Sequence, residues 1–97
     1  MPLFVMIGRD GTDGAARRDE NRDAHIRHLE SLTEAGKIRY AGPIRDASNA
    51  QSVGAVIVYE ATSLEHAREL VEQDPYVAGG VFETWTLDPF RQAIPEP

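Results

Sequence analysis

The sequence predicts an α+β fold in which four strands and two helices follow one another in the order β-α-β-β-α-β. Two runs, LFVMI at residues 3–7 and VGAVIVY at residues 53–59, are apolar at almost every position, as in central strands. Two longer segments carry apolar residues at helical spacing, and turn-forming residues separate the elements. This order is that of the ferredoxin-like fold, whose right-handed crossovers place the first and third strands in the middle of an antiparallel sheet.

The first strand is predicted over residues 2–8, an apolar run that a glycine closes, and the polar stretch RDGTDG after it indicates a loop. A helix is predicted over residues 15–35, because Ile26, Leu29 and Leu32 recur at helical intervals before a glycine stop signal. The segment KIRYAGP predicts a second, shorter strand that ends at its proline.

A polar, turn-rich connection, IRDASNAQS, leads into a third strand that is predicted over residues 53–60. A second helix is predicted over residues 61–74, where Thr62 and Glu65 have the spacing of a capping box and an apolar stripe follows. The alternating segment VFETWTL predicts the last strand over residues 81–87.

The chain length favours one domain over residues 1–97, with a globular core at 1–90 and a proline-containing tail at 91–97. Sixteen acidic against ten basic residues give a net charge of −6, which disfavours a nucleic-acid partner. The N-terminal apolar run is too short to cross a bilayer and lacks a basic flank, so we expect neither a membrane span nor a signal peptide. Without cysteine there is no disulfide or thiolate. We therefore expect a soluble, cytoplasmic protein.

One face of the predicted sheet lacks a cover, because two helices can cover only the other. Phe4, Met6, Val56 and Val58, or the residues that alternate with them, would then lie in water. An apolar patch of this kind marks an interaction surface. We therefore expect a homodimer whose sheets pack face to face, as in a dimeric α+β barrel.

The first predicted helix carries candidate chemistry on one face. At about 100° per residue, His25 falls about 40° from Leu29, and Arg22 about 20° from it on the other side. Arg18 lies on the same stripe one turn earlier, whereas His28 lies about 100° away near the helix flank. His25 would line a pocket at one end of the sheet; alternatively, it is an interior histidine that is hydrogen-bonded to backbone.

Asp74 stands between the second predicted helix and a proline, in the stretch VEQDPYVAGGVFETW. A carboxylate is disfavoured at a helix C-terminus. Asp74 is therefore either a helix exit of the common Asp-Pro type or the acceptor for a cationic or proton-donating partner. In this fold the end of the second helix can approach the first. If Asp74 accepts a hydrogen bond from one ring nitrogen of His25, it fixes the tautomer and makes the other nitrogen a better base.

Three segments, RDAHIRHL, AGP and DPYVAGGVFE, resemble in order and spacing the YciI-like (YCII-related) family of small dimeric α+β barrel proteins. The resemblance extends from the first strand to DPF near the C-terminus, and DPYVAGGVFE is its specific part. It implies a ferredoxin-like fold, a face-to-face dimer and an active site built on a histidine–aspartate pair, here His25 and Asp74. A dehydrochlorinase that acts on a chlorinated hydroxyquinol is known in this family, which gives lyase chemistry a precedent.

Four further residues are candidate substrate contacts. Arg22 matches the family's arginine three residues before the histidine and would orient an anionic or phenolate group, unless its stem only covers the helix surface. Gly42 and Pro43 match the Gly-Pro that ends the family's second strand. Tyr76 would border the pocket, or else be a core tyrosine with a satisfied hydroxyl.

One departure from the family concerns a small hydroxyl residue that many relatives carry near the start of the third strand. Gly54 is expected at that place, with Ser52 close by. If the hydroxyl helps to hold the substrate, this chain holds a different one.

Two functions remain open at this point. The first is a cofactor-independent enzyme in which His25, oriented by Asp74, moves a proton to or from a small cyclic or aromatic substrate; elimination, isomerisation and hydrolysis all suit it. The alternative is a non-catalytic module that binds a small acidic metabolite. The histidine spacing matches no metal motif, and phosphate-cradling loops and nucleophile elbows are absent, so we expect neither metal nor cofactor.

Overall fold

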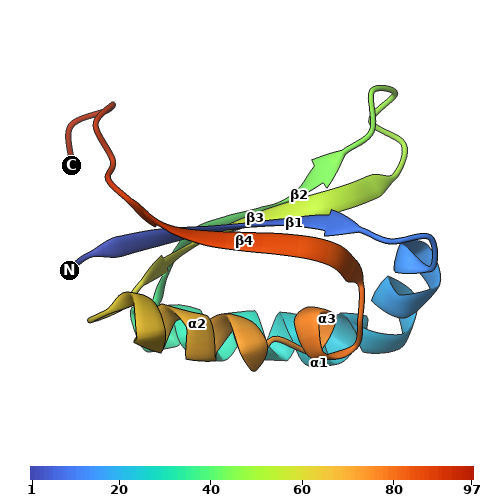
Figure 1. Ribbon diagram of the computed structural model, residues 1–97, viewed down its shortest axis with the longest axis horizontal. Helices are drawn as coiled ribbons and strands as arrows, with labels where there is room; N and C mark the ends of the chain where they lie inside the picture. The colour runs from blue at the N-terminus through green and yellow to red at the C-terminus, as the bar shows by residue number, and fades with distance from the viewer.

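The computed structural model describes residues 1–97 and contains the six predicted elements with one short helix added. The elements are β1 (Leu3–Asp10), α1 (Gly14–Glu34), β2 (Ile38–Arg45), β3 (Ser52–Glu60), α2 (Leu64–Glu72), α3 (Pro75–Ala78) and β4 (Phe82–Phe90). The strands form one antiparallel sheet in the order β2-β3-β1-β4. All three helices cover the same face of this sheet (Figure 1). The predicted ferredoxin-like α+β fold is confirmed.

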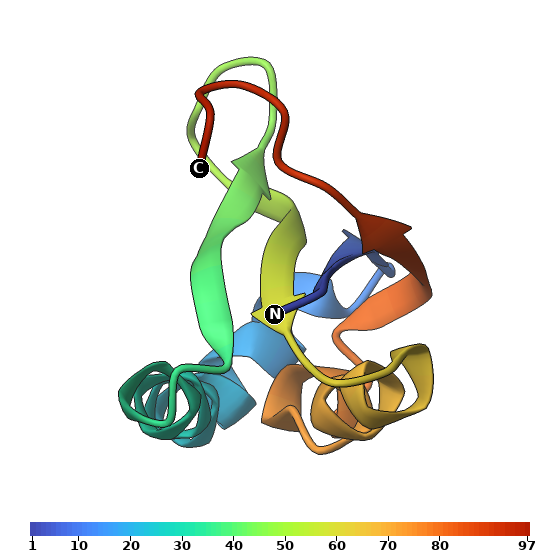
Figure 2. The same cartoon turned by 90° about the vertical axis from the view of Figure 1, so that its left-hand side faces the viewer.

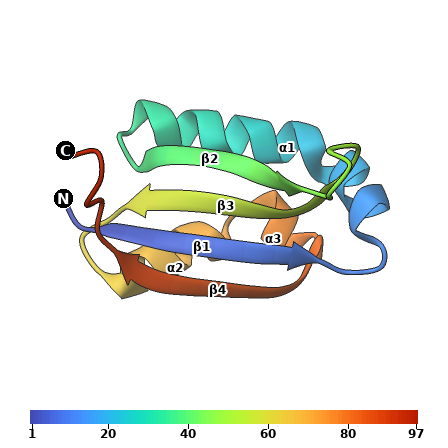
Figure 3. The same cartoon turned by 90° about the horizontal axis from the view of Figure 1, so that it is seen from above.

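The hydrophobic core lies between the sheet and the helices. β1 and β3 occupy the middle of the sheet, as their apolar runs predicted, and Met6, Ile57 and Tyr59 are fully buried there against Val71 and the other helix residues of the core. Seen from above the sheet, α1 runs along the β2 side, whereas α2 and α3 lie toward β1 and β4 (Figure 3). The helix α1 and the pair of helices α2 and α3 therefore cover different halves of the sheet.

The pairing register shows which residues of the central strands face the helices. Phe4 pairs with Tyr59 and Met6 with Ile57, and all four belong to the buried core. Residues directly opposite each other in an antiparallel pair point to the same side of the sheet. Of the two sets that the sequence left open for the face without helices, Phe4 and Met6 therefore do not lie there.

In β1, the residues that alternate with Phe4 and Met6 lie on the face without helices. Val5 pairs with Val58 and Ile7 with Val56, so this face combines the alternates in β1 with the predicted residues in β3. We call this side of the sheet the open face. Its apolar residues are Leu3, Val5, Ile7, Tyr40, Val56, Val58 and Phe90, of which Val58 is fully buried and does not lie in water as predicted.

The last strand is longer than predicted. β4 continues to Phe90 and includes Pro89, although the predicted strand ended at residue 87. β4 is an edge strand, and a proline is tolerated at an edge because only one side of such a strand needs backbone donors. Residues 91–97 then leave the end of the sheet on the side away from the helices (Figure 1).

The segment after β3 differs from the prediction in two ways. Ser63, not Thr62, caps α2, since its hydroxyl accepts a hydrogen bond of 3.0 Å from the backbone N–H of His66. The second helix also ends earlier than predicted, and the separate one-turn helix α3 follows it. None of the helices has the length and apolar composition that a bilayer-spanning helix needs.

Asp74 is the N-cap of α3 rather than the end of α2. Its Oδ1 accepts a hydrogen bond of 2.9 Å from the backbone N–H of Tyr76, and Pro75 occupies the first helical position, where no donor is needed. The carboxylate therefore lies at a helix N-terminus, where the backbone dipole favours negative charge. Asp74 directly follows Gln73, the C-cap of α2, as the predicted helix exit, but its carboxylate is favourably placed as the N-cap of α3.

Candidate active site

A cavity of about 390 Å³ lies between α1 and the β2–β3 half of the sheet. Arg18, Arg22, His25 and Leu29 line it from α1, so the four residues placed on one helical face share one space. None of the 13 lining residues is acidic, although the chain as a whole carries a net charge of −6. His28, three residues after His25, is not part of the lining.

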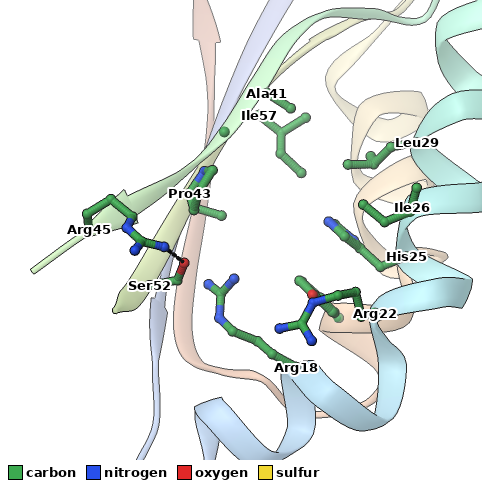
Figure 4. Close-up of a pocket in the computed structure, with 13 residues that line it drawn as sticks. Arg18, Arg22, His25, Ile26, Leu29, Ala41, Pro43, Arg45, Ser52 and Ile57 are labelled. Carbon is green, nitrogen blue, oxygen red and sulfur yellow. Dashed lines mark hydrogen bonds between the residues drawn. The ribbon is translucent and has the colours of Figure 1, made fainter. Parts of the chain in front are cut away.

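The cavity is polar at one end and apolar at the other (Figure 4). Arginine side chains and Ser52 gather at one end, and Leu29, Ala41 and Ile57 lie at the other. His25 projects between them. A ligand that spans the cavity would therefore place its middle beside the imidazole.

His25 and Asp74 are 49 residues apart in the chain and meet directly. Nδ1 of His25 lies 2.7 Å from Oδ1 of Asp74, whose carboxylate is fully buried, whereas the histidine side chain is 12% exposed. An ionised carboxylate can only accept, so a hydrogen bond to it requires the tautomer with the ring proton on Nδ1. Nε2 is then left as a proton acceptor on a ring that lines the cavity.

Tyr76 holds both members of this pair. Its backbone N–H donates to Asp74, and its ring stacks on His25 with 3.7 Å between centroids and 3° between planes. Phe82 packs edge-on against the other side of this arrangement, with 6.4 Å between the Tyr76 and Phe82 centroids. Tyr76 is thus both a cavity residue, as one prediction had it, and a buried core residue, as the alternative had it.

Arg18 was not predicted as a site residue, yet it is the most buried charged side chain of the cavity wall. Its Nε and Nη2 form a two-pronged ion pair with Asp10, at 2.8 and 2.9 Å, and Nη2 also donates to the carbonyl oxygen of Gly54 at 2.9 Å. Its Cζ lies 5.2 Å from the centre of the Tyr76 ring. The helical stripe could have indicated Arg18, but its burial depends on partners in β1 and β3.

Arg22 lies at the cavity but remains exposed. Its Nη1 donates to Asp19 at 2.8 Å, and the two side chains are 53% and 74% exposed. The hydrogen bond that Arg22 donates to Asp19 and, to a lesser degree, the interaction with Tyr76 raise the pKa of Arg22 above its ordinary value. The guanidinium therefore stays charged beside the ligand space, and a role in ligand binding stays a prediction.

The facing wall contains the predicted Gly42 and Pro43, together with Ser52. The Ser52 hydroxyl accepts a hydrogen bond of 3.0 Å from Arg45. Gly54 does not line the cavity, and a Cβ there would come within 2.5 Å of a backbone carbonyl oxygen. The structure therefore places Ser52, not Gly54, where a hydroxyl can reach a ligand.

Three buried polar atoms of the chain have no hydrogen-bond partner. They are Oδ2 of Asp74, the hydroxyl oxygen of Tyr59 and Nε2 of His28. Burial raises the pKa of Tyr59 far above its ordinary value, and the charge of Asp74 adds to the shift. Tyr59 therefore stays neutral, and a second negative charge does not form near Asp74.

Comparison with known proteins identifies the family. The model of the YCII-related domain matches residues 2–91. The chain belongs to the YCII-related family. This YCII-related chain is 34% identical to Protein YciI of Escherichia coli O6:H1, over 95% of the chain and 99% of the relative.

Among solved structures, this YCII-related chain is similar to 5-chloro-2-hydroxyhydroquinone dehydrochlorinase (TftG) from Burkholderia phenoliruptrix AC1100, in complex with 2,5-dihydroxybenzoquinone. The two superpose with a TM-score of 0.83 and 26% identity, over 94% of this chain and 95% of the other. The cofactor-independent oxygenase SnoaB from Streptomyces nogalater, at 17% identity and a TM-score of 0.50, shares the fold.

Proposed function

We propose that this protein is a cofactor-independent enzyme that performs general acid–base chemistry on a small cyclic or aromatic substrate. The observation that carries the proposal is the contact of 2.7 Å between His25 and the fully buried Asp74, on the wall of a cavity of about 390 Å³. A buried carboxylate that orients an imidazole beside a ligand space is an arrangement that catalytic bases share.

In this proposal His25 is the base and Asp74 positions it. Asp74 accepts the Nδ1 proton, so Nε2 is free to take a proton from the substrate. The imidazolium that forms is then stabilised by the adjacent carboxylate, which Tyr76 holds in place through its backbone N–H. Arg22, Gly42, Pro43 and Tyr76 are the proposed substrate contacts.

Elimination is the reaction that the similarities favour. The similar TftG is a dehydrochlorinase by name, and loss of HCl from a hydroxylated ring moves a proton to a base and a chloride ion to solvent. No electrons enter or leave, so one positioned base suffices. The polar end of the cavity suits hydroxyl or oxyanion groups, and its apolar end suits a ring (Figure 4).

The assay for this proposal is chloride release from 5-chloro-2-hydroxyhydroquinone, together with a wider panel of halogenated and hydroxylated phenols. We expect turnover of at least one member of the panel. Binding of panel members without turnover of any of them would instead favour the non-catalytic binding module.

We also propose that the open face is covered by a second copy of this chain. Ile7, Tyr40 and Phe90 of that face are 37%, 54% and 37% exposed, and no helix covers them, because all three helices lie on the other face. The β2–β3 hairpin and the C-terminal tail both rise on this side and border it (Figure 2). A sheet packs in two layers, and a chain of this size gains stability by burying the second face.

Light scattering after gel filtration is expected to give twice the 10.7 kDa mass of one chain. Ile7→Glu places a charge in the proposed interface and is expected to give monomers. Leu64→Glu is the matched control, because Leu64 is 38% exposed, but on α2 and away from the open face. A wild-type monomer at high micromolar concentration would contradict the proposed dimer.

A further inference from the structure

Arg18 has one donor group that no protein atom uses. Its Nε and Nη2 are occupied by Asp10 and by the Gly54 carbonyl, whereas Nη1 donates no hydrogen bond within the chain. Nη1 is also not among the buried atoms that lack a partner, so it is open to the cavity that Arg18 lines. The guanidinium is therefore held rigidly with two N–H bonds directed at the ligand space.

The fixation of Arg18 distinguishes it from the other arginines of the cavity. The Arg18 side chain is 8% exposed, whereas that of Arg22 is 53% exposed and bound only to the exposed Asp19. A donor that is already fixed and partly desolvated loses little entropy when it binds an anion. Its hydrogen bonds to a charged acceptor are also stronger than those of an exposed donor.

The rest of the wall fits an anion with an apolar body. The lining contains no carboxylate, and Arg22 and Arg45 add positive charge near Arg18. At the opposite end, Leu29 and Ile57 offer apolar contacts (Figure 4). The Arg18–Asp10 pair has no net charge and fixes the direction of the hydrogen bond from Arg18. The exposed Arg22 and Arg45 attract the anion electrostatically.

We infer that the natural ligand is a small planar anion, bound with its charged oxygen on Nη1 of Arg18 and its apolar ring toward Leu29. This inference names the ligand class of the enzyme proposed above. Only the statement that the ligand reacts depends on that proposal. In this orientation the ligand ring lies beside Nε2 of His25. By fixing the anionic group, Arg18 determines which bonds of the ring face this base. Arg22, which is 53% exposed and paired only with the exposed Asp19, contributes to attraction more than to placement.

The test compares benzoate with benzamide, which has nearly the same shape but no charge. We expect calorimetric titration to show that benzoate binds about tenfold to a hundredfold more tightly than benzamide. Arg18→Lys keeps a positive charge next to Asp10 but removes the free Nη1 group. It is expected to weaken benzoate binding by about tenfold or more and to leave benzamide binding unchanged.

Arg17→Lys is the matched control, because Arg17 precedes Arg18 on the same helix and does not line the cavity. It is expected to change neither affinity by more than about twofold. If Arg18→Lys folds poorly, the double variant Arg18→Gln with Asp10→Asn replaces the ion pair by two amides and tests the same loss of preference. Equal binding of benzoate and benzamide, or wild-type benzoate binding by the Arg18 variants, would overturn the inference.

Binding is measured without turnover, so this test fails or succeeds independently of the enzyme proposal. If the protein prefers benzoate through Arg18 but releases chloride from no substrate, the inferred ligand class is supported and the proposed enzyme function is contradicted. If the protein turns over a halogenated phenol yet shows no preference for an anion, the enzyme proposal is supported and the inferred ligand class is contradicted.

Discussion

His25→Asn is expected to lower the turnover rate in the chloride-release assay by about 10²–10⁴-fold, with the fold retained. The amide nitrogen of asparagine lies near the place of Nδ1 and can still donate to Asp74, whereas the group that takes the proton, Nε2, is lost.

The stability of the same variant separates catalysis from a structural role. Because Asp74 keeps a donor, we expect the free energy of unfolding to fall by only about 1 kcal/mol, a shift in melting temperature of about 4–8 °C. His66→Asn, on α2 and outside the cavity, is the matched control and should change neither activity nor melting temperature appreciably. A large loss of stability with undiminished activity would make His25 an interior structural histidine.

Asp10→Asn is expected to lower the free energy of unfolding by about 3–5 kcal/mol. The Asp10 and Arg18 side chains are 9% and 8% exposed, so removing the carboxylate leaves a buried guanidinium without its counter-charge. For a chain of this length the loss corresponds to a fall in melting temperature of roughly 15–30 °C. Thermal and urea unfolding of the purified variant would measure both quantities.

Asp13→Asn is the matched control for this prediction. Asp13 pairs with Arg17 at 3.9 Å, but its side chain is 74% exposed, so the change should cost less than about 0.5 kcal/mol. Adding Arg18→Gln to Asp10→Asn should recover part of the lost stability, since the unpaired charge disappears. Similar small effects of the Asp10 and Asp13 substitutions would contradict the burial argument.

If the Arg18–Asp10 pair and the His25–Asp74 pair behave as expected, they have different roles. The first pair joins α1 to β1 and, through the Gly54 carbonyl, to β3. It therefore fixes the polar end of the cavity as part of the fold. The second pair joins α1 to the start of α3 and leaves one imidazole nitrogen free for chemistry.

Some features of the site were missed although a local signal was present. The dipeptide Asp74-Pro75 is a typical helix start, with a capping carboxylate followed by a proline at the first helical position. The sequence predicts a helix exit or a partnered carboxylate there, and not a helix start, because α3 is only four residues long, too short to show periodicity. Arg18 was placed on the right helical face, but its burial gave no signal in the sequence.

The assignment of sheet faces shows a different limit. LFVMI and VGAVIVY are apolar on both sides, so alternation does not say which side the helices cover. The register decides it: Phe4 and Met6 pair with residues of the buried face, and Val5 and Ile7 lie on the open face. When odd and even positions of a strand are equally apolar, only the packing of the helices decides which side of the strand they cover.

The sequence alone determined the order of the elements, the central place of β1 and β3, and the helical face that carries Arg18, Arg22 and His25. Each of these depends on residues a few positions apart, whose spacing follows from the geometry of a single helix or strand. Only the tertiary structure decided that Asp74 reaches His25, that Asp10 and Gly54 enclose Arg18, and that Ser52 faces the cavity. Those contacts join distant segments, and they form because burying a charge is favourable only where packing supplies its partner.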